Sequence, residues 1–180
     1  MAMPATAFDQ HAPIWAALAD LSDPEIPVVS LSELGILREV RTGADGRPEV
    51  VITPTYSGCP AMGQIEDDVR AALANAGINA RVVTQLAPAW TTDWMSEAAR
   101  EKLRAYGIAP PQCGSGANAG NDAGTNVLKF SRQALQREAV PCPQCGSTHT
   151  TETSPFGSTA CKAMYRCLNC LEPFDYFKPY

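Results

Sequence analysis

The chain has 180 residues, of which 45% are hydrophobic and 18% charged, with seven cysteines and a formal net charge of −5. This apolar fraction is too high for intrinsic disorder, and no apolar run approaches the roughly 20 residues that span a bilayer. The length suits one main domain with a small appended module. The first residues lack the basic and apolar regions of a secretory signal, so we expect a cytoplasmic protein with no membrane partner.

Charge is distributed unevenly along the chain. Residues 1–126 carry a net charge of −7 and residues 127–180 a net charge of +2. An acidic main domain is a poor electrostatic match for phosphate backbones, and the basic side chains of the tail are scattered rather than clustered. We therefore expect no nucleic-acid partner, while the pattern leaves a homo-oligomer open.

The hydrophobic pattern predicts alternating helices and strands up to residue 108. A short helix is expected at 13–21, and extended segments at 36–41 and 49–55 flank a Gly- and Asp-rich loop that predicts an antiparallel pair. Helical spacing then predicts a helix at 60–76, followed by a strand at 80–86 and a second amphipathic helix at 95–106. A threonine or Asp93 in the preceding segment can cap this last helix. The order predicts an α+β fold with a small mixed sheet and packed helices.

The composition changes after residue 108. Residues 109–126 are mostly Gly, Ala, Pro, Asn and Ser and offer little to bury, which is typical of a linker or a functional flap. We therefore expect a main domain at 12–108, a linker at 109–126 and a C-terminal module at 127–180. Cys113 lies in the linker, and the sequence leaves open whether the linker folds over Cys59.

Four cysteines near the C-terminus form two CxxC pairs: Cys142, Cys145, Cys167 and Cys170. Two such turns can complete a tetrahedral shell of thiolates around one ion. The pattern predicts a structural zinc site in a β ribbon, although the same thiolates could hold iron or an iron–sulfur cluster. Cys161, between the two pairs, is expected as a small buried strand residue rather than a fifth ligand.

A separate cysteine follows the second predicted strand. Cys59 directly precedes Pro60, the expected first residue of the next helix, so we expect Cys59 at the N-cap, where free N–H groups and the helix dipole favour a thiolate. Such a thiol is nucleophilic and can bind a soft metal ion. Thr53 and Thr55 alternate along the strand and could line the same pocket. The alternative is an inert, half-buried cysteine.

Two carboxylates form a second candidate group. Asp23 precedes Pro24 and is held extended, so the side chains of Asp23 and Glu25 are expected to point the same way. Two carboxylates and a thiolate would suit iron. The alternatives are capping of the first helix by Asp23 and a solvated Glu25. Neither of the two histidines is a candidate base for Cys59, so a Cys–His hydrolase is weakly supported.

Four blocks resemble, in order, the MIP/SufT-type domain of iron–sulfur cluster assembly proteins: DPEIPV at 23–28, LGI at 34–36, TxTxxGCP at 53–60 and WTxDxMS at 90–96. The C-terminal ribbon adds FGST at 156–159 and EPF at 172–174. With this ribbon, the chain resembles the PaaD family, the accessory proteins encoded with the multicomponent phenylacetyl-CoA epoxidase of aerobic phenylacetate degradation.

The resemblance implies an accessory or maturation factor that assists iron–sulfur cluster assembly or delivery. It favours a non-catalytic protein over an enzyme. The implied partners are the flavin/iron–sulfur reductase, the other epoxidase subunits and the iron–sulfur assembly machinery. Cys59 is then the reactive cysteine that transiently holds iron or a cluster, and the residues implied around it are Asp23, Glu25, Thr53 and Thr55. The alternatives are a docking subunit without cluster transfer and a thiol-based redox enzyme that uses Cys59.

Overall fold

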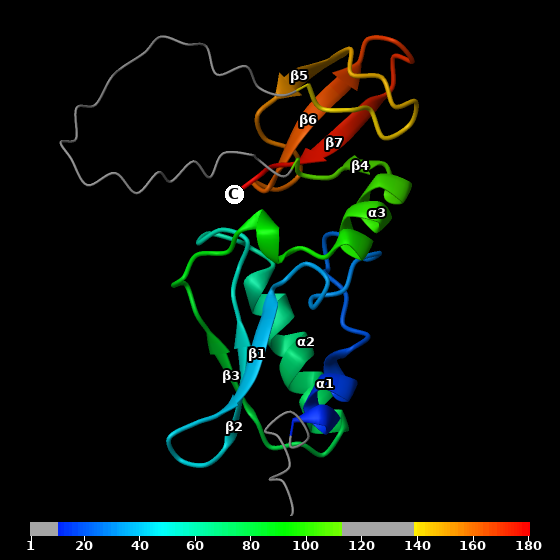
Figure 1. Cartoon of the computed structure of the whole chain (residues 1–180). Coiled ribbons are helices and arrows are strands. Elements are labelled where there is room, and N and C mark those ends of the chain that lie inside the picture. The colour runs from blue at the N-terminus through cyan, green and yellow to red at the C-terminus, as the bar shows by residue number, and fades with distance from the viewer. Residues whose placement is uncertain (1–10, 113–138) are drawn as a thin grey trace, which may run out of the picture.

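A computed structural model describes residues 11–112 and 139–180 of the chain. Figure 1 shows a main domain built of helices and a small sheet, with a separate sheet formed by the C-terminal part of the chain packed at one end. The main-domain elements are α1 (Ala12–Leu18), β1 (Leu37–Thr42), β2 (Pro48–Ile52), α2 (Met62–Asn75), β3 (Arg81–Thr84), the 3-10 helix η1 (Thr92–Trp94) and α3 (Glu97–Tyr106). The second sheet contains β4 (Ile108–Ala109), β5 (Thr150–Ser154), β6 (Lys162–Cys167) and β7 (Pro173–Phe177). The expected linker beyond residue 112, including Cys113, lies outside the described residues.

The main-domain sheet has the strand order β1-β2-β3. β1 and β2 are antiparallel across the loop that contains Gly46, whose φ of 80° requires the freedom of glycine. β2 and β3 are parallel, and α2 provides the crossover connection that a parallel pair requires. The predicted α+β fold with a small mixed sheet is confirmed.

The helices of the main domain bury regular apolar stripes. α2 buries Ile65, Val69 and Leu73, four residues apart and therefore on one face, and α1 buries Ile14 and Leu18 in the same way. These five side chains belong to the same hydrophobic core as the sheet. Figure 1 shows α2 lying against the sheet, with α1 beside it. Within residues 11–112 and 139–180, every helix is too short or too polar to cross a bilayer.

The N-terminus of α3 differs from the sequence expectation. The side chain of Ser96 accepts a hydrogen bond of 3.1 Å from the backbone N–H of Ala99 and so caps the helix. The prediction that a threonine or Asp93 caps it is wrong, because Thr92–Trp94 form a separate 3-10 turn before the helix begins.

The C-terminal sheet has the strand order β4-β7-β6-β5 and its own small apolar core. The contributors to that core are Ala109, Val140, Cys142, Ala163, Tyr165, Cys167, Phe174 and Tyr176. β5, β6 and β7 follow one another as antiparallel neighbours, and β4 adds a parallel edge from the end of α3. The module is the expected β ribbon, extended by one short strand.

The ribbon is joined to the main domain by packing as well as by the chain. Ile108 is buried in the main core, whereas Ala109, the next residue of β4, is buried in the ribbon core. Ala109, where we expect the linker to begin, thus lies in a strand of the ribbon sheet. Phe177 at the end of β7 returns to the main core and packs against Trp90, with ring centroids 6.0 Å apart.

Candidate metal centre and cysteine pocket

The four ribbon cysteines converge on one point. Cys142 and Cys145 come from the turn before β5, Cys167 is the last residue of β6, and Cys170 lies in the turn that leads to β7. Their four sulfur atoms all lie within 4.8 Å of one another, with Sγ–Sγ distances of 3.7 Å between Cys142 and Cys170 and 3.6 Å between Cys145 and Cys167.

These sulfur–sulfur distances fit a tetrahedral metal ion. Zn–S bonds of about 2.3 Å imply edges of about 3.8 Å between thiolates in a tetrahedron. The backbone N–H groups of Cys170 and Asn169 each donate to the Sγ of Cys167 at 3.4 Å. The first of these bonds is the main reason why the pKa of Cys167 falls to about 6, so this sulfur is ready to bind a cation near neutral pH. The four cysteines form a metal-binding site.

The two CxxC turns have the same backbone form with different residues. The residue after the first pair is Gly146 with a φ of 74°, and the residue after the second is Leu171 with a φ of 68°. Leu171 is therefore held in a left-handed conformation that residues other than glycine rarely adopt. Its side chain is 59% exposed, so the conformation is not the result of packing on the core.

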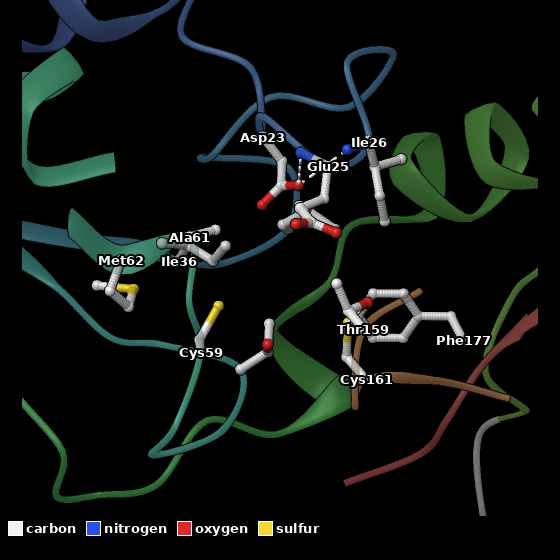
Figure 2. Close-up of a pocket in the computed structure, with 12 residues that line it drawn as sticks. Asp23, Glu25, Ile26, Ile36, Cys59, Ala61, Met62, Thr159, Cys161 and Phe177 are labelled. Atoms are coloured by element: carbon white, nitrogen blue, oxygen red, sulfur yellow. Dashed lines mark hydrogen bonds between the residues drawn. The ribbon is translucent and has the colours of Figure 1, made fainter. Parts of the chain in front are cut away.

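A second site is a cavity at the junction of the two domains. Its volume is about 400 Å³ when the open space at the entrance is included. The enclosed part has room for about one water molecule. Figure 2 shows Cys59 on one side, Asp23 and Glu25 along another, and Thr159, Cys161 and Phe177 opposite Cys59. The complete lining is Asp23, Glu25, Ile26, Leu34, Ile36, Thr55, Cys59, Ala61, Met62, Thr159, Cys161 and Phe177.

Cys59 lies farther from α2 than the sequence suggests. The helix begins at Met62 with Ala61 at the N-cap, because Tyr56 and Cys59 close a tight turn through a Cys59 N–H bond to the Tyr56 carbonyl at 3.2 Å. Burial raises the pKa of the Cys59 thiol, against the effect of a hydrogen bond from the Ala61 N–H. The expectation of a helix-capping thiolate is therefore wrong for the metal-free protein, in which Cys59 holds its proton at neutral pH.

Asp23 faces the cavity from the loop between α1 and β1. Its Oδ1 accepts hydrogen bonds from the backbone N–H groups of Glu25 and Ile26, both at 2.9 Å, and so closes a local turn rather than capping α1. Burial raises the pKa of Asp23 although these two bonds oppose that shift. Glu25 is exposed and borders the same cavity. The structure thus brings both expected carboxylates and Cys59 to one space.

The two threonines of the same sequence block behave differently. Thr55 is buried and lines the cavity. Thr53 is also buried, but it lies beside β1, where its N–H donates to the Ile36 carbonyl at 2.8 Å, and it does not line the cavity. The alternation that we expect along a strand fails here because β2 ends at Ile52.

Cys161 is the cavity residue that the sequence pattern does not connect with Cys59. It is buried and absent from the four-cysteine site, as expected, but it lies in the turn before β6 rather than in a strand. Its position just before β6 places it opposite Cys59 because the end of the ribbon packs back on the main domain. The only sequence signal was a cysteine in the ribbon without a role in the CxxC pairs.

Comparisons with known proteins agree with this two-part architecture. A family model described as "Iron-sulfur cluster assembly protein" matches residues 11–84, and a model described as "PaaD zinc beta ribbon domain" matches residues 129–178. The chain is thus an iron–sulfur assembly domain joined to a zinc-ribbon domain.

The relatives identify the family. The chain is 49% identical, over 92% of its own length and 90% of the relative, to a protein of Escherichia coli that is named as a putative subunit of 1,2-phenylacetyl-CoA epoxidase. It is 38% identical, over 48% of its length and 83% of the relative, to the "Fe-S protein maturation auxiliary factor" of Porphyromonas gingivalis. The crystal structure of a DUF59 domain from Bacillus anthracis aligns with 54% of this chain and 97% of that one, at 30% identity and a TM-score of 0.48. The chain belongs to the PaaD family of phenylacetyl-CoA epoxidase subunits.

Proposed function

We propose that the chain is a maturation factor of a phenylacetyl-CoA epoxidase, and that it helps to deliver iron or an iron–sulfur cluster to the reductase component. The observation that carries the proposal is the convergence of Cys59, Asp23 and Glu25 on one cavity. Thiolate and carboxylate together suit iron. The family relation to an epoxidase subunit and to iron–sulfur maturation factors supports the choice of client.

The cavity residues have separable tasks in this function. Cys59 supplies the thiol that binds the iron cargo and gives up its proton on binding. Asp23 is fixed by its two backbone hydrogen bonds, so one carboxylate oxygen, Oδ1, is already engaged and the other can face a cation. Glu25 stands at the exposed side, where cargo enters or leaves.

The ribbon site has a different task. We assign zinc to the four ribbon cysteines, because a closed shell of four thiolates leaves no position open for cargo. A module with such a small core gains much of its folding free energy from the metal. None of the six described cysteines forms a disulfide, so the four ribbon sulfurs are available to a metal ion.

The test is expression of the reductase with and without this protein in the same host. Iron per reductase polypeptide and the visible cluster absorbance should fall markedly without it, and Cys59→Ser should behave like its absence. Cys113→Ser is the matched control and should support full loading. Unchanged iron content with Cys59→Ser would reject the proposal.

A second candidate is a docking subunit that transfers no cluster. It is favoured by apolar side chains that the ribbon exposes, since Phe156, Met164, Leu168 and Leu171 are all more than 40% exposed. This candidate predicts stable co-purification with the oxygenase subunits that does not depend on Cys59. A thiol enzyme is disfavoured, because burial raises the pKa of Cys59 and so lowers the fraction of reactive thiolate at neutral pH.

A further inference from the structure

The junction cavity is lined by two thiols from different domains. Cys59 belongs to the iron–sulfur assembly domain, and Cys161 belongs to the ribbon, more than a hundred positions later in the chain. Figure 2 shows them on opposite sides of the same space, with Asp23 and Glu25 along its border. The cavity is therefore completed only when the ribbon packs on the assembly domain.

The position of Cys161 is fixed by hydrogen bonds within the C-terminal part of the chain. Its carbonyl accepts the Lys178 N–H at 2.9 Å, and its Sγ lies 3.0 Å from the Thr159 hydroxyl. The hydroxyl of Tyr180 donates to the carbonyl of Ala160 at 3.1 Å and holds the same loop from the C-terminal end. The loop thus presents a buried thiol toward the assembly domain.

Both thiols are protonated in the metal-free protein. Burial raises the pKa of Cys59 and also that of Cys161, and the nearby Cys161 sulfur raises the pKa of Cys59 further through repulsion between the ionised forms. A cation between them would remove this repulsion and replace the lost hydration. Such an arrangement favours two thiolates when a metal ion is bound and two thiols when it is released.

We propose that Cys161 is the second thiol ligand of the iron cargo held at Cys59, so that the ribbon closes the cargo site. The proposal rests on the proposed function and extends it to the ribbon. Binding of ferrous iron releases one proton from each thiol and forms two Fe–S bonds, and the iron remains ferrous. Asp23 is the adjacent carboxylate ligand.

Binding requires the side chains of the cavity to rearrange. Among the described residues, only the four ribbon cysteines have ligand atoms that all lie within 4.8 Å of one another. Cys59, Cys161 and Asp23 do not lie this close together, so their side chains must turn toward a shared ion. The Sγ of Cys161 would leave the Thr159 hydroxyl, and the ion would take the enclosed space that has room for about one water molecule. A cluster would instead need the mouth of the cavity to open.

The experiment is anaerobic titration of the zinc-loaded full chain with ferrous iron, and separately with ferrous iron, ferric iron and sulfide, which together supply the oxidation states of a cluster. We expect wild type to release about two protons per iron and Cys161→Ser to release about one, with at least about tenfold weaker binding. Cys59→Ser should show the same loss. Binding only when sulfide is present would identify the cargo as a cluster, and binding of iron alone would identify it as an ion.

Three controls separate a lost ligand from a damaged fold. Zinc content should be the same in every variant. Cys113→Ser should bind iron as wild type does. Tyr180→Phe loosens the same loop without removing a thiol, and it should keep iron affinity within about threefold, well under one tenfold step of 1.4 kcal/mol.

The proposal is overturned if wild type binds neither form of iron, if Cys161→Ser binds iron and releases protons as wild type does, or if Tyr180→Phe loses as much affinity as Cys161→Ser. The proposed function is tested by iron in the reductase and can fail separately. If loading of the reductase needs Cys59 and not Cys161, the maturation role stands and the ligand role of Cys161 is rejected.

Discussion

Asp23 is a buried carboxylate on which burial and hydrogen bonding act in opposite directions. Its Oδ1 accepts two backbone N–H groups, yet burial raises its pKa above the ordinary value of 3.8. The folded protein therefore holds this proton to a higher pH than the unfolded chain does. Ionisation of Asp23 lowers the free energy of unfolding. This stability is present below pH 3.8 and is lost as the pH rises from 3.8 through the pKa of Asp23 in the folded state.

Replacement of Asp23 by asparagine tests this balance. Asp23→Asn keeps an oxygen acceptor and removes the buried charge, so it should be more stable than wild type at pH 7 and lose that advantage as the pH falls toward 3.8. Urea unfolding at several pH values measures the difference, with the exposed Asp20→Asn as a control without the effect. A less stable Asp23→Asn at pH 7 would contradict the prediction.

The second CxxC turn carries local backbone strain that the first does not. Both turns end in a residue with positive φ, but only the first has glycine there. Leu171 is exposed, so its side chain contributes little packing to set against the strained backbone.

Exchanging the residue type at these two positions should have opposite effects. Gly146→Ala should destabilise the metal-bound ribbon by about 1–2 kcal/mol, since its Cβ would meet no atom within 4 Å and only the backbone is strained. Leu171→Gly should stabilise it by up to about 1 kcal/mol, because relief of strain exceeds the added entropy of the unfolded chain. Chemical denaturation of the zinc-loaded protein measures both, and equal signs would refute the explanation.

The elements that follow from local pattern are the ones the sequence predicts well. The stripe Ile65, Val69 and Leu73 predicts α2, and the loop with Gly46 predicts the β1–β2 pair. The N-cap of α3 at Ser96 was missed, because Thr91, Thr92 and Asp93 carry the same capping chemistry a few residues earlier. Propensity alone does not distinguish such neighbouring caps.

The candidate sites also contain one part that a local sequence pattern predicts and one part that it does not. The convergence of the ribbon cysteines follows from CxxC spacing, since each turn is local. The place of Cys161 opposite Cys59 depends on Phe177 packing in the core of the main domain, a contact between distant segments that has no periodic signal. The burial of Arg100 is likewise not predictable from a local pattern. Its guanidinium is buried because it donates hydrogen bonds to the carbonyls of Pro111 and Thr92.

The ribbon forms one wall of the junction cavity that contains Cys59. Phe177 is 1% exposed and lies in the main core, and the Thr92 N–H donates to the Tyr180 carbonyl at 3.2 Å. Unfolding of the ribbon would therefore expose Cys59 to solvent as well as the side chains of the ribbon core.

Removal of the ribbon metal tests this coupling. A chelator should unfold β5 to β7 and increase the alkylation rate of Cys59 several-fold, because the wall that carries Cys161 and Phe177 is lost. Cysteine-resolved mass spectrometry of the Cys113→Ser protein measures this rate. Alkylation of Cys59 that is unaffected by metal removal would show that the two domains fold independently.

The proposed function depends on one step, the passage of iron from the Cys59 cavity to a client protein. The measurement is anaerobic transfer of labelled iron from the purified, iron-loaded chain to the cluster-free reductase, which is then reisolated and counted. We expect transfer from wild type and from Cys113→Ser to be faster than uptake of the same concentration of free ferrous iron, and we expect no such advantage for Cys59→Ser. Equal uptake from Cys59→Ser, or from free iron alone, would contradict it.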